Sequence, residues 1–146
     1  MRGLAPYMNS LHAEFGGRAR FVMVYIHEAH AVDEWPINSA RCNGTRGAVC
    51  IRAPVTTAER CESAAAFARD FNVRMPMLVD LVEGEEFEKH YAPWPLRFFI
   101  VQQGKLQHIA SPENSGHYSL QPVREWLLAH CAETRTATVE ASEPVA

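Results

Sequence analysis

The feature that most constrains the fold is the unbroken run of apolar, β-forming residues from Phe21 to Ile26. The run lacks the alternation of polar and apolar residues that a strand with one face in water shows, so we expect both of its faces to be covered. Strands of this kind occur in parallel sheets, whose connections pass through helices. The run therefore predicts an α/β domain with helices packed against a sheet.

Length and composition are those of an ordinary globular protein. The 146 residues suit one domain with its own core, and the apolar fraction of 47% and net charge of -3 are unremarkable. Because the mild acidity is spread along the chain, we expect no nucleic-acid partner. No run approaches the roughly 18 apolar residues that cross a bilayer, and no signal-peptide core follows Met1, so we expect a cytoplasmic protein without a membrane partner.

The rest of the sequence predicts further helices and strands in alternation. A capping box from Thr56 to Glu59 opens a helix, Gln103-Gly104 marks the turn of a β-hairpin, and Pro122 begins a closing helix. The expected elements are a helix over 4–15, the strand 21–26, a helix with Cys61, Ala64, Ala65, Ala68 and Phe71 as its apolar stripe, a strand over 77–80, a short helix over 85–91, a hairpin over 96–110, and a helix after 122. Residues 1–131 are thus predicted to form one domain, and 132–146 a disordered tail.

A carboxylate and an imidazole follow the buried strand directly. Glu28 and His30 lie two residues apart, so at a strand end they can share a proton and face a pocket. The alternative is a histidine that only caps the strand end, which is the commoner case for an isolated Glu-x-His. No further ligands stand at suitable spacing, so we expect no metal site.

This string also carries a family resemblance. Residues 25–35 resemble the signature of the iodothyronine deiodinases, Tyr-Ile-x-Glu-Ala-His-x-x-Asp-x-Trp. Weaker matches are Met75-Pro76-x-x-Val79-Asp80, Trp94-Pro95-x-Arg97-x-x-x-Val101 and Gly104, and the resemblance covers about 8–132. It implies a selenocysteine-dependent oxidoreductase with a thioredoxin-like fold, a mixed sheet flanked by helices. The order of the expected elements is that of this fold without its first strand.

The resemblance also implies roles for individual residues. His30 would donate or relay a proton to the leaving carbon or the phenol of the substrate, while Glu28 orients the imidazole and Tyr25 hydrogen-bonds the substrate or a selenenyl oxygen. The substrate pocket would include Trp35, Pro95 and His117, with Pro95 at the position where thioredoxin-like folds hold a cis-proline beside the nucleophile.

The nucleophile itself is expected outside this chain. An ungapped alignment places the family's selenocysteine immediately before Met1, so we expect a selenocysteine upstream of Met1, no bound cofactor, and a thiol reductant as co-substrate. The first strand of the fold is central, and without it neighbouring strands would expose unpaired backbone groups. We therefore expect the 146-residue chain to be inactive and poorly folded by itself. A paralogue that has no nucleophile is the rival interpretation.

The substrate is left open by two departures from the family. Pro54 stands where vertebrate deiodinases carry a histidine, and Glu113 lies in the loop that engages the hormone's carboxylate. The expected reaction is therefore reductive dehalogenation of an iodothyronine, of the thyroxine 5′-deiodinase type, or of a related halogenated aromatic.

Two other functions remain as alternatives. A thiol or selenol peroxidase-like protein would reduce a peroxide, with Cys42 and Cys50 as resolving thiols, whereas Cys61 and Cys131 are expected to be inert core thiols. A catalytically dead thioredoxin-like binding module would use only the pocket. The sequence also leaves a homodimer open.

Overall fold

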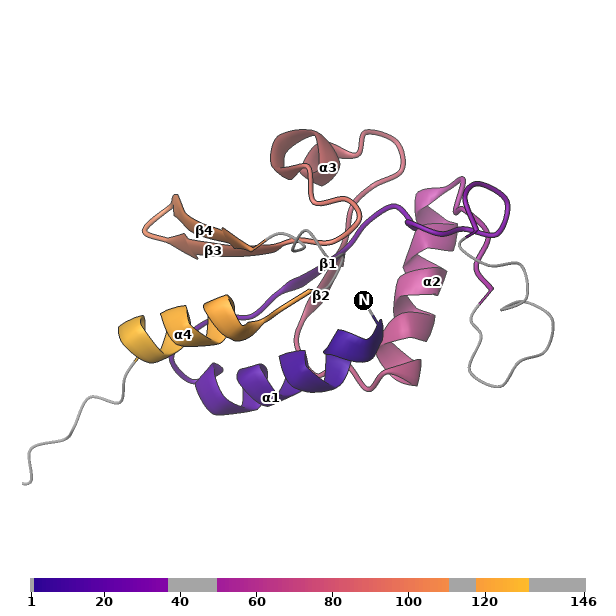
Figure 1. The fold of residues 1–146 in the computed structure, drawn as a ribbon. Coiled ribbons are helices and arrows are strands. Elements are labelled where there is room, and N and C mark those ends of the chain that lie inside the picture. Colours follow the sequence, from indigo (N-terminus) through magenta and orange to yellow (C-terminus); the bar gives the residue numbers. More distant parts are fainter. Residues whose placement is uncertain (1, 37–49, 111–117, 132–146) are drawn as a thin grey trace, which may run out of the picture.

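The computed structural model describes residues 2–36, 50–110 and 118–131 (Figure 1). Cys42, Glu113, His117 and the predicted tail lie outside these residues. The elements are η1 (Arg2–Leu4), α1 (Ala5–Phe15), β1 (Met23–Tyr25), α2 (Thr57–Asp70), β2 (Met77–Val79), α3 (Glu86–Tyr91), β3 (Phe98–Gln102), β4 (Lys105–Ala110) and α4 (Gln121–His130). The predicted α/β class and the order of helices and strands are confirmed.

The four strands form two separate pairs. β1 lies parallel to β2, with Met23 opposite Met77 and Tyr25 opposite Val79. β3 and β4 form the predicted antiparallel hairpin. Its turn residues, Gln103 and Gly104, both have positive φ (52° and 72°), the geometry of a tight two-residue turn. Within the described residues no strand pairing joins the two pairs, so β1 and β3 each have one unpaired edge.

The core is divided in the same way. One buried cluster joins α1, α4 and β4 through Leu11, Phe15, Ala110, Leu120, Val123 and Leu127, and β3 packs on it through Phe98 and Ile100. A second cluster joins β1 to α2 through Tyr25, Ala64 and Phe67. Figure 1 shows α1 and α4 side by side below the strands and α2 on the other side of β1. The helices thus flank the strands as a thioredoxin-like fold requires.

The burial predicted for both faces of the first strand is confirmed only in part. Tyr25 and Ile26 are buried, but Val22 is 45% exposed, and Leu78 in the neighbouring strand is 59% exposed. These side chains lack cover because β1 has a strand on one side only. Full burial of an apolar strand requires neighbours as well as a favourable sequence.

Helix α2 buries a different stripe from the one predicted. Its buried residues are Arg60, Ala64 and Phe67, while Cys61, predicted to be a core thiol, is exposed. The helix is rotated by about one residue because Arg60 finds buried hydrogen-bond partners. The capping box is confirmed: the Thr56 side chain accepts a hydrogen bond from Glu59 N at 3.2 Å.

Candidate active site

The loop that follows β1, residues 26–36, brings the predicted catalytic side chains to the carboxyl end of the parallel strand pair. Tyr25, the last residue of β1, is buried against Phe67 of α2. Its hydroxyl donates a hydrogen bond to Oε1 of Glu28. Because Tyr25 is fixed by the core, this bond holds the Glu28 carboxylate at the strand end.

His30 is held by the backbone of its own loop. Its Nδ1 lies 3.2 Å from the carbonyl oxygen of Trp35. A carbonyl only accepts, so Nδ1 carries the proton in this tautomer and Nε2 is left to accept or deliver one. Within the described residues Nε2 makes no hydrogen bond, and Glu28 bonds Tyr25 rather than His30. The imidazole is therefore oriented by the Trp35 carbonyl and not by Glu28.

Two tryptophans lie beside this imidazole. The Trp35 ring is stacked on that of Trp94, with centroids 6.3 Å apart and planes inclined by 20°. The His30 ring centroid is 5.6 Å from that of Trp35. The Trp94–Pro95 peptide bond is cis, as the resemblance implied for this position. The stack therefore brings the segment of Trp35 next to the segment of Trp94 and Pro95.

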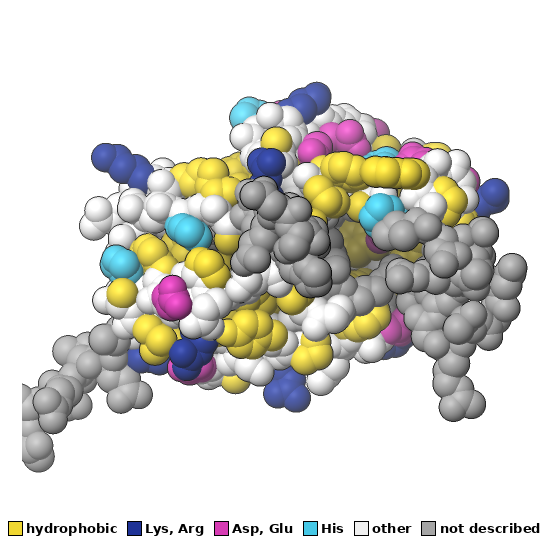
Figure 2. Space-filling model, viewed as in Figure 1, with side chains coloured by type: hydrophobic (Ala, Val, Ile, Leu, Met, Phe, Trp, Pro, Cys, Tyr) yellow, Lys and Arg dark blue, Asp and Glu magenta, His cyan; other side chains and the backbone are white. Residues whose placement is uncertain are grey.

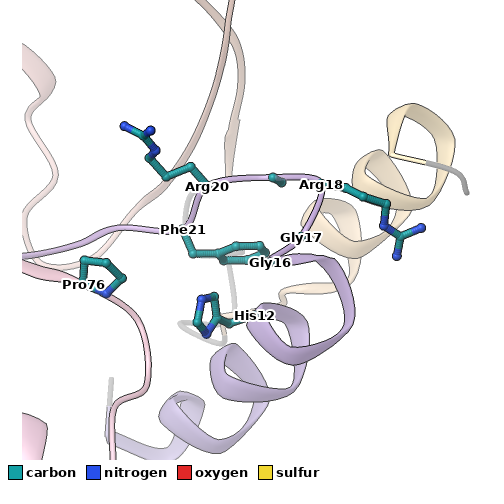
Figure 3. Close-up of a pocket in the computed structure, with 8 residues that line it drawn as sticks. His12, Gly16, Gly17, Arg18, Arg20, Phe21 and Pro76 are labelled. Atoms are coloured by element: carbon teal, nitrogen blue, oxygen red, sulfur yellow. The ribbon is translucent and has the colours of Figure 1, made fainter.

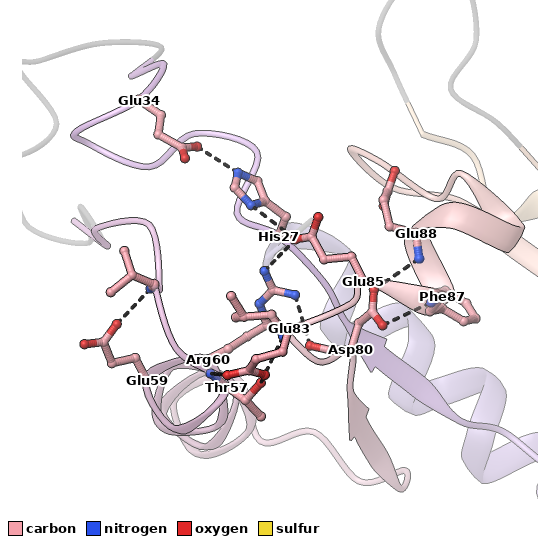
Figure 4. A network of polar contacts seen from close by, with 12 residues as sticks. His27, Glu34, Thr57, Glu59, Arg60, Asp80, Glu83, Glu85, Phe87 and Glu88 are labelled. Atoms are coloured by element: carbon pink, nitrogen blue, oxygen red, sulfur yellow. Dashed lines mark hydrogen bonds and ion pairs between the residues drawn. The ribbon is translucent and has the colours of Figure 1, made fainter.

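A network of charged side chains ties the loop to the rest of the molecule (Figure 4). Nε2 of His27 lies 2.7 Å from Oε2 of Glu34, and Nδ1 lies 3.9 Å from Oε1 of Glu85. The guanidinium of Arg60 binds the same Glu85 oxygen at 2.9 Å. His27 therefore connects the loop, through Glu85, to a cation on α2.

Arg60 anchors this network in the interior. The residue is only 1% exposed, and its Nη1 donates to the backbone carbonyl of Asp80 at 3.0 Å. The Asp80 carboxylate in turn accepts from the amides of Phe87 and Glu88 at 3.0 and 3.1 Å, which satisfies the start of α3. A buried charge is tolerated when it is paired and hydrogen-bonded, and Arg60 meets this condition through Nη1 and Nη2, while its buried Nε has no hydrogen-bond partner in the described structure.

Asp33 connects the loop after β1 to residues 52–53. The backbone amide of Ala53 donates to its carboxylate at 2.8 Å, and Arg52 Nε lies 3.6 Å from it. These two contacts, the Ala53 amide first, hold the pKa of Asp33 below its ordinary value of 3.8. The ionised form is therefore favoured by folding.

Asp33→Asn should lower stability near neutral pH and lose its effect in acid. A carboxyl group whose pKa is lower in the folded than in the unfolded chain stabilises the fold at pH values above its ordinary pKa. This stabilisation is lost as the pH falls through the pKa of the folded state. The urea midpoint of the variant should lie below that of the wild-type protein at about pH 7, and the two midpoints should converge as the pH falls below 3.8 and through the lowered pKa of Asp33. Asp70→Asn, at an exposed carboxylate paired with the adjacent Arg69, is the matched control. A midpoint difference that persists in acid would contradict this account.

A cavity of about 370 Å³ lies at the opposite end of β1 (Figure 3). It is formed by the C-terminal end of α1 and the residues before β1, and His12, Phe21 and Pro76 face it. Arg18 and Arg20 extend away from it in the close-up view. Neither Glu28 nor His30 lines it. By contrast, hydrophobic, acidic and histidine side chains lie close together at the upper right of Figure 2, where Figure 1 places the loop after β1.

The described residues provide neither a metal centre nor a membrane-crossing helix. Among residues 2–36, 50–110 and 118–131, no three His, Cys, Asp or Glu side chains are grouped as metal ligands. In the same part of the chain, no helix has both the length and the apolar composition that crossing a bilayer requires. Cys50 is disulfide-bonded, whereas Cys61 and Cys131 are free thiols. Neither free thiol hydrogen-bonds Glu28 or His30 in the described structure.

Comparison with known proteins agrees with this arrangement. The family model of the iodothyronine deiodinases matches residues 5–130. The chain belongs to the iodothyronine deiodinase family. Type I iodothyronine deiodinase of Xenopus laevis is 30% identical over 98 residues, 67% of this chain and 35% of the relative. Type II iodothyronine deiodinase of Sus scrofa is 27% identical over 131 residues, 84% of this chain and 44% of the relative. The chain thus spans less than half the length of these two deiodinases.

Several residues of this deiodinase-family site escaped the sequence analysis. His27 stands at an unspecified position of the signature, and Arg60, Glu85 and Trp94 lie far from it in sequence. Arg60 alone left a signal: it is spaced from Ala64 and Phe67 as a member of one helical face, and an arginine in line with buried residues indicates a buried partner. Trp94 was noted only as part of the Trp94-Pro95 match, because only folding brings it to Trp35.

Proposed function

We propose that the protein containing this chain reductively deiodinates an iodothyronine, with a thiol as the electron donor. The observation that carries the proposal is the arrangement of Tyr25, Glu28 and His30 at the end of β1. In the net reaction, an aryl iodide and two thiols give the deiodinated arene, hydrogen iodide and one disulfide. The carbon–iodine bond breaks, a carbon–hydrogen bond forms, and the electron pair comes from the two thiols.

His30 is suited to supply the proton that replaces iodine. Nδ1 is engaged by the Trp35 carbonyl, which fixes the ring plane, and Nε2 has no partner in the described residues. The side chain is exposed, so a substrate can approach it. A general acid placed in this way accelerates proton transfer by about 10² to 10⁴.

Glu28 and Tyr25 have a different role in this proposal. Their hydrogen bond places a carboxylate and a phenol beside the imidazole. The Tyr25 hydroxyl can exchange its bond to Glu28 for one to the substrate, whose phenol is a donor and an acceptor. This pair therefore positions the substrate, while His30 handles the proton.

We further propose that the nucleophile is a selenocysteine on a segment before Met1, as the family resemblance implies. Such a residue supplies the group that takes up iodine and is then reduced by the thiol. The support is structural: β1 and β3 each have one unpaired edge, and Phe21, two residues before β1, and Phe98, the first residue of β3, pack on the same cluster. A strand leading into α1 would pair with these edges and close the sheet.

Iodide release tests the proposal directly. The gene product that includes the codons before Met1 should release iodide from thyroxine with dithiothreitol as the thiol, and the 146-residue chain should not. The matched control replaces the upstream selenocysteine by serine and should be inactive. Iodide release by the 146-residue chain would overturn the assignment of the nucleophile. Reduction of a peroxide without iodide release would instead favour the peroxidase-like alternative.

A further inference from the structure

The exposed indole pair, Trp35 and Trp94, is the feature of the described surface that the catalytic residues leave unexplained. Trp35 is 64% exposed and Trp94 38% exposed, although each ring carries a large apolar area that is usually buried. The rings contact each other rather than the core, since neither belongs to a buried cluster. Exposed apolar groups gathered in one place mark binding sites more often than isolated ones do.

The indole pair stands next to the proposed proton donor. The His30 ring lies 5.6 Å from the Trp35 ring, inclined by 56°. Trp94 on the far side precedes the cis-proline and so comes from the segment that leads into β3. An aromatic ring that stacked on these indoles would therefore lie within reach of the imidazole Nε2. This geometry fits a planar aromatic substrate.

The charges around the indole pair are mostly negative. Residues 26–36 contain the carboxylates Glu28, Asp33 and Glu34 and no lysine or arginine. Glu85 adds a fourth carboxylate, reached through His27.

Among the described residues, arginines offset two of these acids. Arg52 is paired with Asp33 and Arg60 with Glu85. Glu28 and Glu34 have no arginine partner in the described structure. Arg97, which follows Trp94 by three residues, has its Nε buried. A carboxylate on the ligand would meet like charges here, whereas an amine would meet opposite ones and the faces of two indoles.

We propose that Trp35 and Trp94 bind the iodinated phenol ring of the substrate, and that the surrounding acids select an aromatic amine lacking a carboxylate. This inference rests on the proposed deiodinase function and names its substrate class. The chemistry that recognises such a ligand is stacking on tryptophan, attraction of its ammonium group by Glu28 and Glu34, and proton delivery from His30. Trp94 completes the stacked surface, and Glu34 contributes to the preference for the amine.

Binding to the longer gene product, with its nucleophile replaced by serine, tests the inference without any turnover. Iodine quenches indole fluorescence on contact, and residues 1–146 contain three tryptophans, of which Trp126 lies on α4 and stacks on His130. In a Trp126→Phe background, residues 1–146 emit only through the indole pair. Diiodotyramine should quench this emission and should bind at least about tenfold more tightly than diiodophenylpropionate, which has the same ring and a carboxylate.

Substitutions locate the site. By calorimetry, Trp94→Leu should weaken diiodotyramine binding about tenfold, whereas Trp126→Leu should leave it unchanged. Glu34→Gln should reduce the preference for the amine severalfold, and Glu62→Gln, at an exposed acid on α2, should not. Circular dichroism of each variant confirms that the fold is retained.

Each part of the inference fails on a distinct result. Equal or tighter binding of the carboxylate probe would overturn the charge preference. Unchanged binding by folded Trp94→Leu would overturn the assignment of the indole pair. If the probes bind as expected but the longer gene product releases no iodide, the binding site stands and the proposed deiodination fails.

Discussion

Replacing His30 by alanine in the nucleophile-bearing protein is expected to lower the turnover number for deiodination about 100-fold or more. The proton that replaces iodine would then have to come from water. Stability should change little, because the side chain is exposed and its one hydrogen bond to the described part of the chain is with the Trp35 carbonyl. Iodide release and the urea midpoint should be measured on the same preparation.

Three further variants separate this role from a purely structural one. Glu28→Gln should reduce turnover less, since the amide oxygen can still accept the Tyr25 hydrogen bond. His90→Ala, at an exposed histidine on α3, should leave turnover unchanged and is the matched control. His30→Gln should not restore activity if the residue transfers a proton. If His30 only caps the strand end, His30→Ala will instead lower the urea midpoint while activity per folded molecule is preserved.

Replacing Arg60 by methionine is expected to lower the free energy of unfolding by about 3 kcal/mol. The substitution keeps most of the side-chain volume but leaves the Asp80 carbonyl and the Glu85 carboxylate without their donors. A buried carbonyl and a partly buried carboxylate that lose a charged donor destabilise the fold more than exposed groups do, and Glu85 keeps only His27, 3.9 Å away, as an ion-pair partner. The partial exposure of Glu85, 38% of its side chain, keeps the expected loss at the lower end of the range for broken buried pairs.

Urea denaturation with two controls checks the role of Arg60. Arg69→Met removes an arginine whose side chain is 74% exposed and should change stability by less than about 0.5 kcal/mol. Adding Glu85→Gln to Arg60→Met should cost less than the sum of the single changes, because the second change removes the unpaired charge. An Arg60→Met variant as stable as Arg69→Met would show that the buried network contributes nothing.

Local signals in the sequence predicted the elements well. The hairpin was readable because Gln103-Gly104 supplies the two positive φ values that a tight turn needs. The start of α2 was readable because the Thr56 side chain binds Glu59 N within four residues. Such interactions depend on residues that are close in sequence, so they can be predicted without knowledge of the fold.

The buried stripe of α2 was predicted wrongly because it depends on residues far away in the sequence. Counting only apolar residues favoured Cys61 and left out Arg60, whose spacing from Ala64 and Phe67 was the one available signal. Its partners, the Asp80 carbonyl and Glu85, are 20 and 25 residues away. Burial of a charge is decided by such distant partners, and a helical pattern read alone assigns the charge to solvent.

The sequence by itself determined the α/β class, the order of the elements, the family, and the position of Glu28 and His30 directly after β1, because periodicity, turn chemistry and a contiguous string carry that information. Only the tertiary structure decided that Glu28 bonds Tyr25, that the Trp35 carbonyl orients His30, that Arg60, Glu85 and His27 tie the loop down, and that Trp94 stacks on Trp35. These contacts join side chains whose separation is fixed by packing and by rotamers. No pattern of spacing along the chain contains that geometry.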